Sequence, residues 1–302
     1  MTKTVHFPGD DGSLMYACDA GVFIPGIEAT LDANRRPIDK KLVLSQNPVV
    51  FLCLGQSNAA NHGETLYSPK HPVYCFNPFN SKFYNCDDPL PGATGSGGSP
   101  WGRMGDFILE NRRDITSVCF VSIAAGGSFI NEWTPPGPYS RRLNFAAERL
   151  QREGLNVSYV LWCQGEAEAN HTSIRRESYI KVFRELLHNI NLTGINSPIY
   201  VSKSTLCETQ DHPFKNREEI RGALEDLVDP GLHIFRGPDT DIIGQEGRFD
   251  GCHFNDSGLN DAARLWFESV NLQLMPPTPT HSIAKRASML PRIIRDFFHS
   301  AH

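Results

Sequence analysis

Ser57 is the first residue whose type and position suggest chemistry. It follows a short apolar run, residues 49–54, and the pair Gly55-Gln56. The β-branched and aromatic content of this run is typical of a buried central strand, and the glycine permits a sharp turn at its end. A hydroxyl at the carboxyl edge of a parallel sheet lies where open α/β folds bind ligands. Ser57 is therefore a candidate nucleophile, although a serine here can equally cap the next helix.

Near the other end of the chain, Asp250 and His253 supply the partners that such a nucleophile needs. A serine hydroxyl requires a base to take its proton, and the base requires a group that fixes its tautomer and stabilises its cation. The sequence Asp250-Gly251-Cys252-His253 places both groups in one short loop, and Gly251 lets that loop turn tightly. Together with the distant Ser57, the pair favours a catalytic triad.

Two further apolar runs end in residues that can stabilise an oxyanion. Residues 118–123 read as a buried strand and lead to the pair Gly126-Gly127, where a bare backbone N–H can face developing negative charge. Residues 157–163 read as another strand and lead directly to Gln164, whose amide can donate without competing for the serine proton. Each pattern alone is also compatible with an ordinary strand end.

In this order, the four segments resemble the conserved blocks of SGNH hydrolases. The resemblance is closest to the sialate O-acetylesterase and acetylxylan esterase-like branch, grouped as carbohydrate esterase family 6, and it covers residues 49–270. It rests on Gly55-Gln56-Ser57-Asn58, Gly126-Gly127-Ser128, the block from Trp162 to Glu168, and Asp250-Gly251-Cys252-His253. The resemblance implies an α/β fold: a three-layer α/β/α sandwich with a mostly parallel, flavodoxin-like central sheet.

The resemblance also implies a reaction, the hydrolysis of an O-acetyl ester on a carbohydrate through an acyl-enzyme. Ser57 is the expected nucleophile, His253 the base, and Asp250 the group that orients His253. Gly127, in preference to Gly126, and Gln164 are expected to bind the oxyanion. Many SGNH hydrolases carry Asn where this chain has Gln164. The residues expected to contact an acetylated saccharide are Gln56, Asn58, Gly126 and Glu166.

Two other functions fit the same segments. A lipase, thioesterase or arylesterase of the same superfamily would prefer longer acyl chains. A non-catalytic carbohydrate-binding module on an esterase fold would normally lack part of the triad, whereas Ser57, Asp250 and His253 are all present. Glu166 and Glu168 resemble a glycosidase pair, but their position after a strand suggests that they anchor the Gln164 loop or border the sugar site.

Composition restricts the partners. The formal net charge of −5 over 302 residues provides no basic field for nucleic acid, and no segment is long and apolar enough to span a bilayer. The first residues have no apolar signal core, so a cytoplasmic location is the default expectation, with an extracellular form still open. No cysteine or histidine spacing predicts a zinc site, and we expect neither a metal nor an organic cofactor.

The eight cysteines read mostly as free thiols. Cys53, Cys119 and Cys163 lie inside predicted strands and are expected to be small core residues. Cys75 and Cys86 flank an aromatic loop and could pair, although free thiols are expected in a chain without a signal segment.

The organisation of the chain predicts three parts. Residues 1–47 are expected to form a small β-rich appendage, residues 48–275 the hydrolase domain, and residues 276–302 a Pro-rich linker followed by an amphipathic helix that could dock on a partner subunit. Within the domain, strands alternate with helices, which favours a parallel sheet covered on both faces. Residues 61–100 are rich in Pro, Asn and Gly and are expected to form a long irregular insert.

Overall fold

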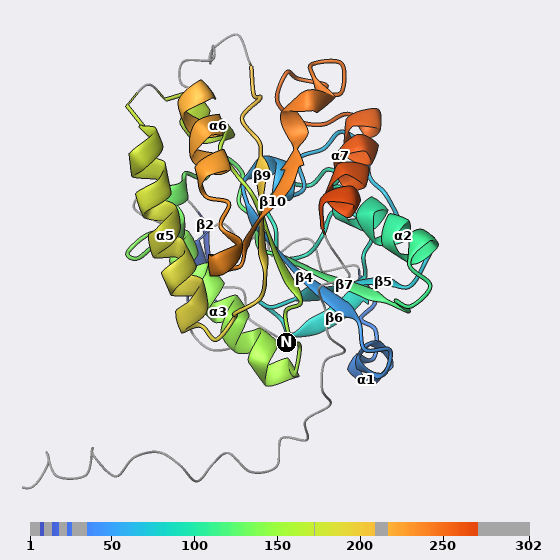
Figure 1. Cartoon of the computed structure of the whole chain (residues 1–302). Helices are drawn as coiled ribbons and strands as arrows, with labels where there is room; N and C mark the ends of the chain where they lie inside the picture. The colour runs from blue at the N-terminus through green and yellow to red at the C-terminus, as the bar shows by residue number, and fades with distance from the viewer. Residues whose placement is uncertain are drawn as a thin grey trace, which may run out of the picture. The chain divides into compact units, whose positions relative to one another are not determined.

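The computed structural model describes residues 35–171, 173–208 and 217–270, together with three short strands at residues 7–8, 14–17 and 23–25. Seven strands within the described residues form one sheet in the order β10-β9-β8-β4-β7-β5-β6 (Figure 1). Neighbouring strands are parallel except β5 and β6, which form an antiparallel pair at one edge. The strands are β4 (Val49–Gly55), β5 (Val73–Asn77), β6 (Lys82–Asn85), β7 (Val118–Ser122), β8 (Tyr159–Cys163), β9 (Ile199–Lys203) and β10 (Ile234–Asp239).

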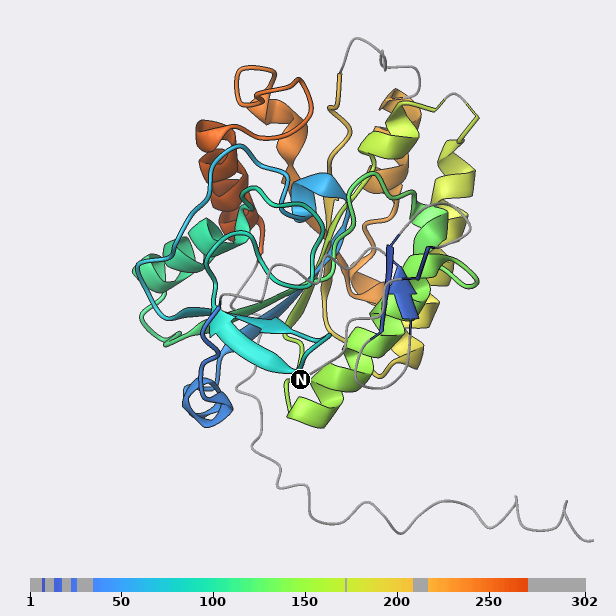
Figure 2. The same cartoon turned by 180° about the vertical axis from the view of Figure 1, so that it is seen from behind.

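Helices cover both faces of this sheet, as seen from opposite sides in Figures 1 and 2. One face is covered by α3 (Pro138–Glu153), α5 (Arg176–Leu192) and α6 (Arg217–Asp226), and the other by α2 (Trp101–Asn111) and α7 (Asp256–Ser269). Shorter helical turns are α1 (Lys40–Ser45), η2 (Ser57–Ala59), η3 (Ile130–Trp133), α4 (Glu166–Ala169), η4 (Pro230–Leu232) and η5 (Thr240–Ile243). The predicted three-layer α/β/α fold with a mostly parallel sheet is confirmed.

Alternation along the strands builds two different cores. Val50, Leu52 and Leu54 of β4 belong to the hydrophobic cluster that also contains buried residues of α3, α5 and α6. On the opposite face, Phe51 stacks on Phe120 and Tyr159 of the two flanking strands, with ring centroids 5.1 and 5.4 Å apart. Because β4 is covered on both faces and paired on both edges, it is a rigid base for the turn that follows it.

The N-terminal region differs in part from the prediction. Three short strands, β1 (Phe7–Pro8), β2 (Leu14–Ala17) and β3 (Phe23–Pro25), form an antiparallel sheet. Residues 40–45, which were included in the predicted β-rich appendage, form the helix α1 instead. The side chain of Asp39 accepts a hydrogen bond from the Lys41 N–H (2.8 Å) and caps this helix. The predicted linker and C-terminal helix of residues 276–302 lie outside the described residues.

The expected irregular insert contains two strands of the central sheet. Residues 73–77 form β5, which pairs in parallel with β7, and residues 82–85 return antiparallel as β6. Ser81, with a φ of 57°, lies in the turn between them. The high content of Pro and Asn around these strands obscured them, but their aromatic side chains pack: the rings of Phe76 and Phe83 lie 4.9 Å apart.

Buried polar groups hold the rest of the insert in place. Asn61 donates to the Leu90 carbonyl (2.9 Å) and accepts from the Leu90 N–H (2.7 Å). Asp88 accepts from the backbone N–H groups of Tyr67 and Ser99 and from the Ser99 hydroxyl (2.7 Å). Burial nevertheless raises the pKa of Asp88 from 3.8 to about 7, against the effect of these hydrogen bonds.

The raised pKa of Asp88 predicts a pH-dependent stability. The folded state holds the Asp88 proton more tightly than the unfolded chain does, so stability is lost as pH rises from about 4 through about 7. Asp88→Asn removes this ionisation, and its amide can donate to the Ser99 hydroxyl while its carbonyl keeps the two backbone donors. Between about pH 5 and about pH 8 we expect the free energy of unfolding of the variant to improve relative to the parent by roughly 2 kcal/mol.

Urea unfolding of both proteins at the two pH values measures this difference. Contributions from other titrating groups are common to both proteins and cancel. A difference between variant and parent that does not change with pH would contradict the assignment of a raised pKa to Asp88.

Candidate active site

Ser57 lies in a sharp turn at the carboxyl end of β4. Gly55 adopts a φ of +124°, and a Cβ at this position would lie 1.9 Å from the carbonyl oxygen of Cys163 on β8. Only glycine fits there, and the Gln56 N–H then donates to the same carbonyl (3.0 Å). Ser57 follows as the first residue of η2 and is 4% exposed. Its hydroxyl makes no hydrogen bond with any of the described residues.

Asp250 and His253 form a compact acid–base pair in the loop before α7. Nδ1 of His253 lies 2.6 Å from Oδ2 of Asp250, and Oδ1 of Asp250 accepts the backbone N–H groups of His253 (2.7 Å) and Cys252 (2.9 Å). Partial burial opposes ionisation of Asp250, but these hydrogen bonds lower its pKa below the ordinary value. The carboxylate therefore holds the proton of His253 on Nδ1 and leaves Nε2 as the acceptor.

One open pocket of about 440 Å³ brings together most of the predicted residues. Ser57 and His253 both line it, although the structure forms no hydrogen bond between them. Hydrogen bonds of this kind are often long without substrate and tighten in the reacting complex. The remaining described residues that line the pocket are Gln56, His62, Thr94, Gly95, Gly126, Gly127, Glu166, Ala167, Asn170, Cys207 and Cys252.

The two candidate glycines differ in what their N–H groups do. The Gly126 N–H donates to Oγ1 of Thr94 (2.7 Å) and is thereby occupied. The Gly127 N–H makes no hydrogen bond within the described residues, and Gly127 has a φ of +70° with open space where a Cβ would lie. Of the pair, Gly127 is therefore the one with a free donor at the pocket.

Gln164 does not line the pocket. It is fully buried, and its Nε2 lies within hydrogen-bond distance of Gln56 Oε1 (3.3 Å), the Ser128 carbonyl (3.2 Å) and Glu168 Oε2. Its Oε1 accepts from the Tyr179 hydroxyl (2.7 Å). An amide with these partners does not face a reacting ester, so this geometry does not support the predicted oxyanion role of Gln164. The longer arm of Gln, compared with Asn, is directed into the core instead.

Gln56 has the free amide that Gln164 lacks. Its Oε1 accepts from Gln164 Nε2 and from the backbone N–H groups of Gly165 (3.4 Å) and Ala167 (3.1 Å). These three donors fix the orientation of the Gln56 amide. Its Nε2 has no partner among the described residues, and Gln56 lines the pocket beside Ser57.

Glu166 lines the pocket and is hydrogen-bonded to Asn58, which does not. Asn58 Nδ2 donates to Glu166 Oε1 (2.9 Å) and to the Cys252 carbonyl (3.2 Å), so Asn58 lies under the pocket and does not line it. Burial raises the pKa of Glu166 to about 7, against the hydrogen bond from Asn58. Glu166 Oε2 and, four residues on, Asn170 Oδ1 are buried acceptors without a hydrogen-bond partner. The second carboxylate, Glu168, accepts from Ile130 N–H (2.5 Å) and Gln164 and anchors this loop as predicted.

His62 is a pocket residue that the sequence patterns did not reveal. Its ring stacks on that of His253, with centroids 5.4 Å apart, and its Nε2 lies 3.2 Å from Oγ1 of Thr94. Burial, with a contribution from the nearby His253, lowers the pKa of His62 to about 4. His62 is therefore neutral at ordinary pH and adds no positive charge next to the base. Its position five residues after Ser57 was the available signal.

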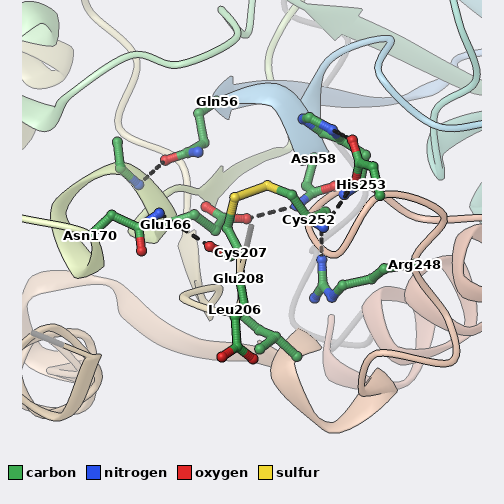
Figure 3. The surroundings of a disulfide bond; sticks show 12 residues. Gln56, Asn58, Glu166, Asn170, Leu206, Cys207, Glu208, Arg248, Cys252 and His253 are labelled. Atoms are coloured by element: carbon green, nitrogen blue, oxygen red, sulfur yellow. Dashed lines mark hydrogen bonds and ion pairs between the residues drawn. A yellow bond between two sulfur atoms is a disulfide. The ribbon is translucent and has the colours of Figure 1, made fainter. Parts of the chain in front are cut away.

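The described cysteines follow the prediction except at Cys207 and Cys252. Cys53, Cys119 and Cys163 are buried free thiols in β4, β7 and β8, as expected, and Cys75 and Cys86 are also free. Cys252, however, forms a disulfide with Cys207, 45 residues away in the sequence (Figure 3). A spacing of this length carries no pairing signal, because only the fold brings the end of β9 next to the Asp250–His253 loop.

Comparison with known families identifies the family of this chain. A family model described as "Carbohydrate esterase, sialic acid-specific acetylesterase" matches residues 47–226, which is more than half of the chain. The chain belongs to this carbohydrate esterase family. It is a carboxylic ester hydrolase of the SGNH type, and the family is one that removes O-acetyl groups from carbohydrates. No curated protein sequence matches this esterase significantly.

Solved structures share the fold of the esterase at low sequence identity. A protein of Arabidopsis thaliana superimposes with a TM-score of 0.56 at 17% identity, over 72% of this chain and 95% of the other. The structure of NanS gives a TM-score of 0.51 at 15% identity, over 73% and 95% of the two chains. These likenesses support the fold of the esterase and leave its site to be argued from its own residues.

The described residues of the esterase contain neither a candidate metal cluster nor a membrane-spanning helix. No group of three or more His, Cys, Asp or Glu side chains in this part of the chain is arranged to hold a metal ion. Among the described helices, none combines the length and the apolar character that crossing a bilayer requires.

Proposed function

We propose that this esterase removes acetyl groups from a carbohydrate through a Ser57 acyl-enzyme. The observation that carries the proposal is the pocket shared by Ser57 and His253, with Asp250 bonded to the far side of the imidazole. A hydroxyl, a base with a fixed tautomer and a carboxylate behind it are the three groups that acyl transfer to a serine requires.

In the proposed reaction, Ser57 Oγ attacks the carbonyl carbon of the ester while Nε2 of His253 takes the hydroxyl proton. The resulting imidazolium is stabilised by Asp250. Collapse of the tetrahedral intermediate breaks the bond to the sugar oxygen, which receives the proton from His253. Water then attacks the acetyl-enzyme with the same base, and Ser57 is released together with acetate.

The oxyanion is assigned to three donors at the pocket. The N–H groups of Ser57 and Gly127 have no hydrogen-bond partner within the described residues, and both residues line the pocket with Gln56. We assign the third donor to Gln56 Nε2, in place of Gln164. Gln164 would then act by holding Gln56 Oε1 from behind, together with Gly165 and Ala167. Donors fixed before the reaction stabilise the transition state most effectively.

The pocket wall supports a small acyl group and a polar leaving group. None of the described residues that line it carries a long aliphatic or phenyl side chain, and three of them are glycines. Glu166 and Asn170 lie on the same wall, and their unpartnered oxygens can accept hydrogen bonds from the hydroxyl groups of a bound sugar after a small rearrangement. A lipid tail would find no long aliphatic or phenyl side chain to pack against among these residues.

The acyl-chain preference tests this assignment. We expect kcat/KM to fall by about tenfold or more from p-nitrophenyl acetate to the butyrate ester, and further to the octanoate, because each methylene that does not fit costs about 1–3 kcal/mol. Release of acetate from a panel of acetylated sugars identifies the leaving group. A rate that rises with chain length would assign the enzyme to the lipases or thioesterases of the superfamily.

A further inference from the structure

The Cys207–Cys252 disulfide joins the loop that carries Asp250 and His253 to the segment that follows β9. Cys252 stands between Asp250 and His253 in the sequence, and Cys207 follows the end of β9. Both cysteines line the pocket that contains Ser57, and Figure 3 shows the disulfide beside His253, Glu166 and Asn170. A covalent bond thus joins the loop of the base to a neighbouring strand end at the edge of the reacting site.

The backbone of Cys252 also makes hydrogen bonds to three other residues. Its carbonyl accepts from Nδ2 of Asn58 (3.2 Å), the residue after Ser57, and from Nη1 of Arg248. Its N–H donates to Oδ1 of Asp250 (2.9 Å). The position of Cys252 therefore influences the turn of the nucleophile and the carboxylate that holds the base.

The backbone beside the disulfide packs closely. The Glu208 N–H donates to the Gly251 carbonyl (2.9 Å), and a Cβ on Gly251, whose φ is +83°, would lie 2.2 Å from the Glu208 carbonyl oxygen. This close approach needs the segments at residues 207–208 and 250–253 to be held together. His253 is partly exposed on the loop, so small movements of the loop change its distance to Ser57.

We propose that the Cys207–Cys252 disulfide is a positioning element that keeps His253 aligned with Ser57, so that turnover depends on the oxidation state of this pair. The inference rests on the proposed function. One thiolate of dithiothreitol attacks the disulfide, which breaks the S–S bond and forms a mixed disulfide with the reagent. The second thiol of the reagent then displaces the protein sulfur, so that two electrons pass to the protein and the products are two cysteine thiols and the oxidised, cyclic reagent. The loop then keeps its hydrogen bonds but loses its covalent connection to residue 207.

The experiment compares kcat and KM of the full chain for p-nitrophenyl acetate before and after reduction, with the thiols counted by mass spectrometry after alkylation. We expect reduction to lower kcat about 10- to 100-fold, because small misplacements of a catalytic group have effects of this size, while KM changes less than threefold. Modification of Ser57 by phenylmethylsulfonyl fluoride is expected to slow in parallel, because it needs the same base but not the sugar site.

The matched control is the double variant Cys207→Ser/Cys252→Ser. It should show the lowered kcat without reductant and no response to reductant, whereas Cys75→Ser, which removes a free buried thiol, should respond as the parent does. If the double variant does not fold, reduction of the parent in place provides the same comparison. Thermal unfolding distinguishes the proposed positioning role of the disulfide from a purely structural one. If the role were purely structural, loss of the disulfide would lower the melting temperature and leave kcat unchanged at lower temperature.

The outcomes separate the two proposals. An active parent whose kcat is unchanged after Cys207 and Cys252 are shown to be reduced would overturn the inference alone. So would a native protein in which both cysteines are free thiols. A parent that hydrolyses no ester, or whose activity persists in Ser57→Ala, would overturn the proposed function and the inference with it.

Discussion

Ser57→Ala is expected to lower ester hydrolysis by at least about 10⁴-fold without loss of the fold. The reason for the loss is chemical, because the substitution removes the attacking oxygen. The reason for the retained fold is structural: the Ser57 hydroxyl has no hydrogen-bond partner among the described residues, so a methyl group leaves no buried donor or acceptor unpaired. Initial rates on p-nitrophenyl acetate and thermal unfolding of parent and variant measure the two effects.

Ser257→Ala is the matched control, since Ser257 is exposed on α7 and does not line the pocket. It should keep the activity of the parent. Residual activity of Ser57→Ala within about tenfold of the parent would show that another group attacks the ester. Mass spectrometry of the parent with a slow ester should also find the acetyl group on the peptide containing Ser57.

Asp250→Asn is expected to reduce kcat by about 10⁴-fold through the tautomer of His253. In the parent, Oδ1 of Asp250 accepts two backbone N–H groups and Oδ2 faces Nδ1 of His253 at 2.6 Å. The carbonyl oxygen of Asn must take the place of Oδ1, so its amide N–H₂ faces Nδ1. His253 then accepts at Nδ1 and carries its proton on Nε2, where it cannot receive the proton of Ser57.

This prediction is checked by the kinetics of Asp250→Asn beside those of Asp261→Asn, an exposed carboxylate that pairs with Arg264. The control should be unaffected, and both variants should unfold near the temperature of the parent. A loss confined to KM in Asp250→Asn would assign Asp250 to substrate binding. Full activity would show that orientation of His253 does not depend on the carboxylate.

The sequence predicted those parts of the fold in which the local pattern and the tertiary structure agree. The apolar runs at residues 49–54, 118–123 and 157–163 became adjacent buried strands, because only strands of this composition fit a sheet covered on both faces. The hairpin of β5 and β6 was not predicted, since Pro and Asn at its ends masked two short aromatic strands. Helix α1 was assigned to the appendage because six residues give too short a pattern.

The candidate site could be predicted where residue type and strand end coincide, as at Ser57 and Gly127. The direction of a side chain at such an end could not. Gln56 and Gln164 are both amides at strand ends, and only their packing decides that Gln164 turns toward Tyr179 and Glu168 while Gln56 keeps a free N–H₂ at the pocket. The Cys207–Cys252 pair joins segments that are distant in the sequence, and no local pattern encodes it. The signal available for His62 was its position five residues after Ser57.

The central position of β4 divides the site between regions of unequal local stability. Ser57 follows a strand that is paired on both edges and covered on both faces, so it lies at the end of an element that opens only when the whole sheet opens. His253 belongs to a partly exposed loop outside the sheet, which the Cys207–Cys252 disulfide and a few hydrogen bonds hold in place. Partial unfolding therefore inactivates the enzyme by removing the base while the nucleophile stays in its native turn, and reclosure of one loop restores the complete site.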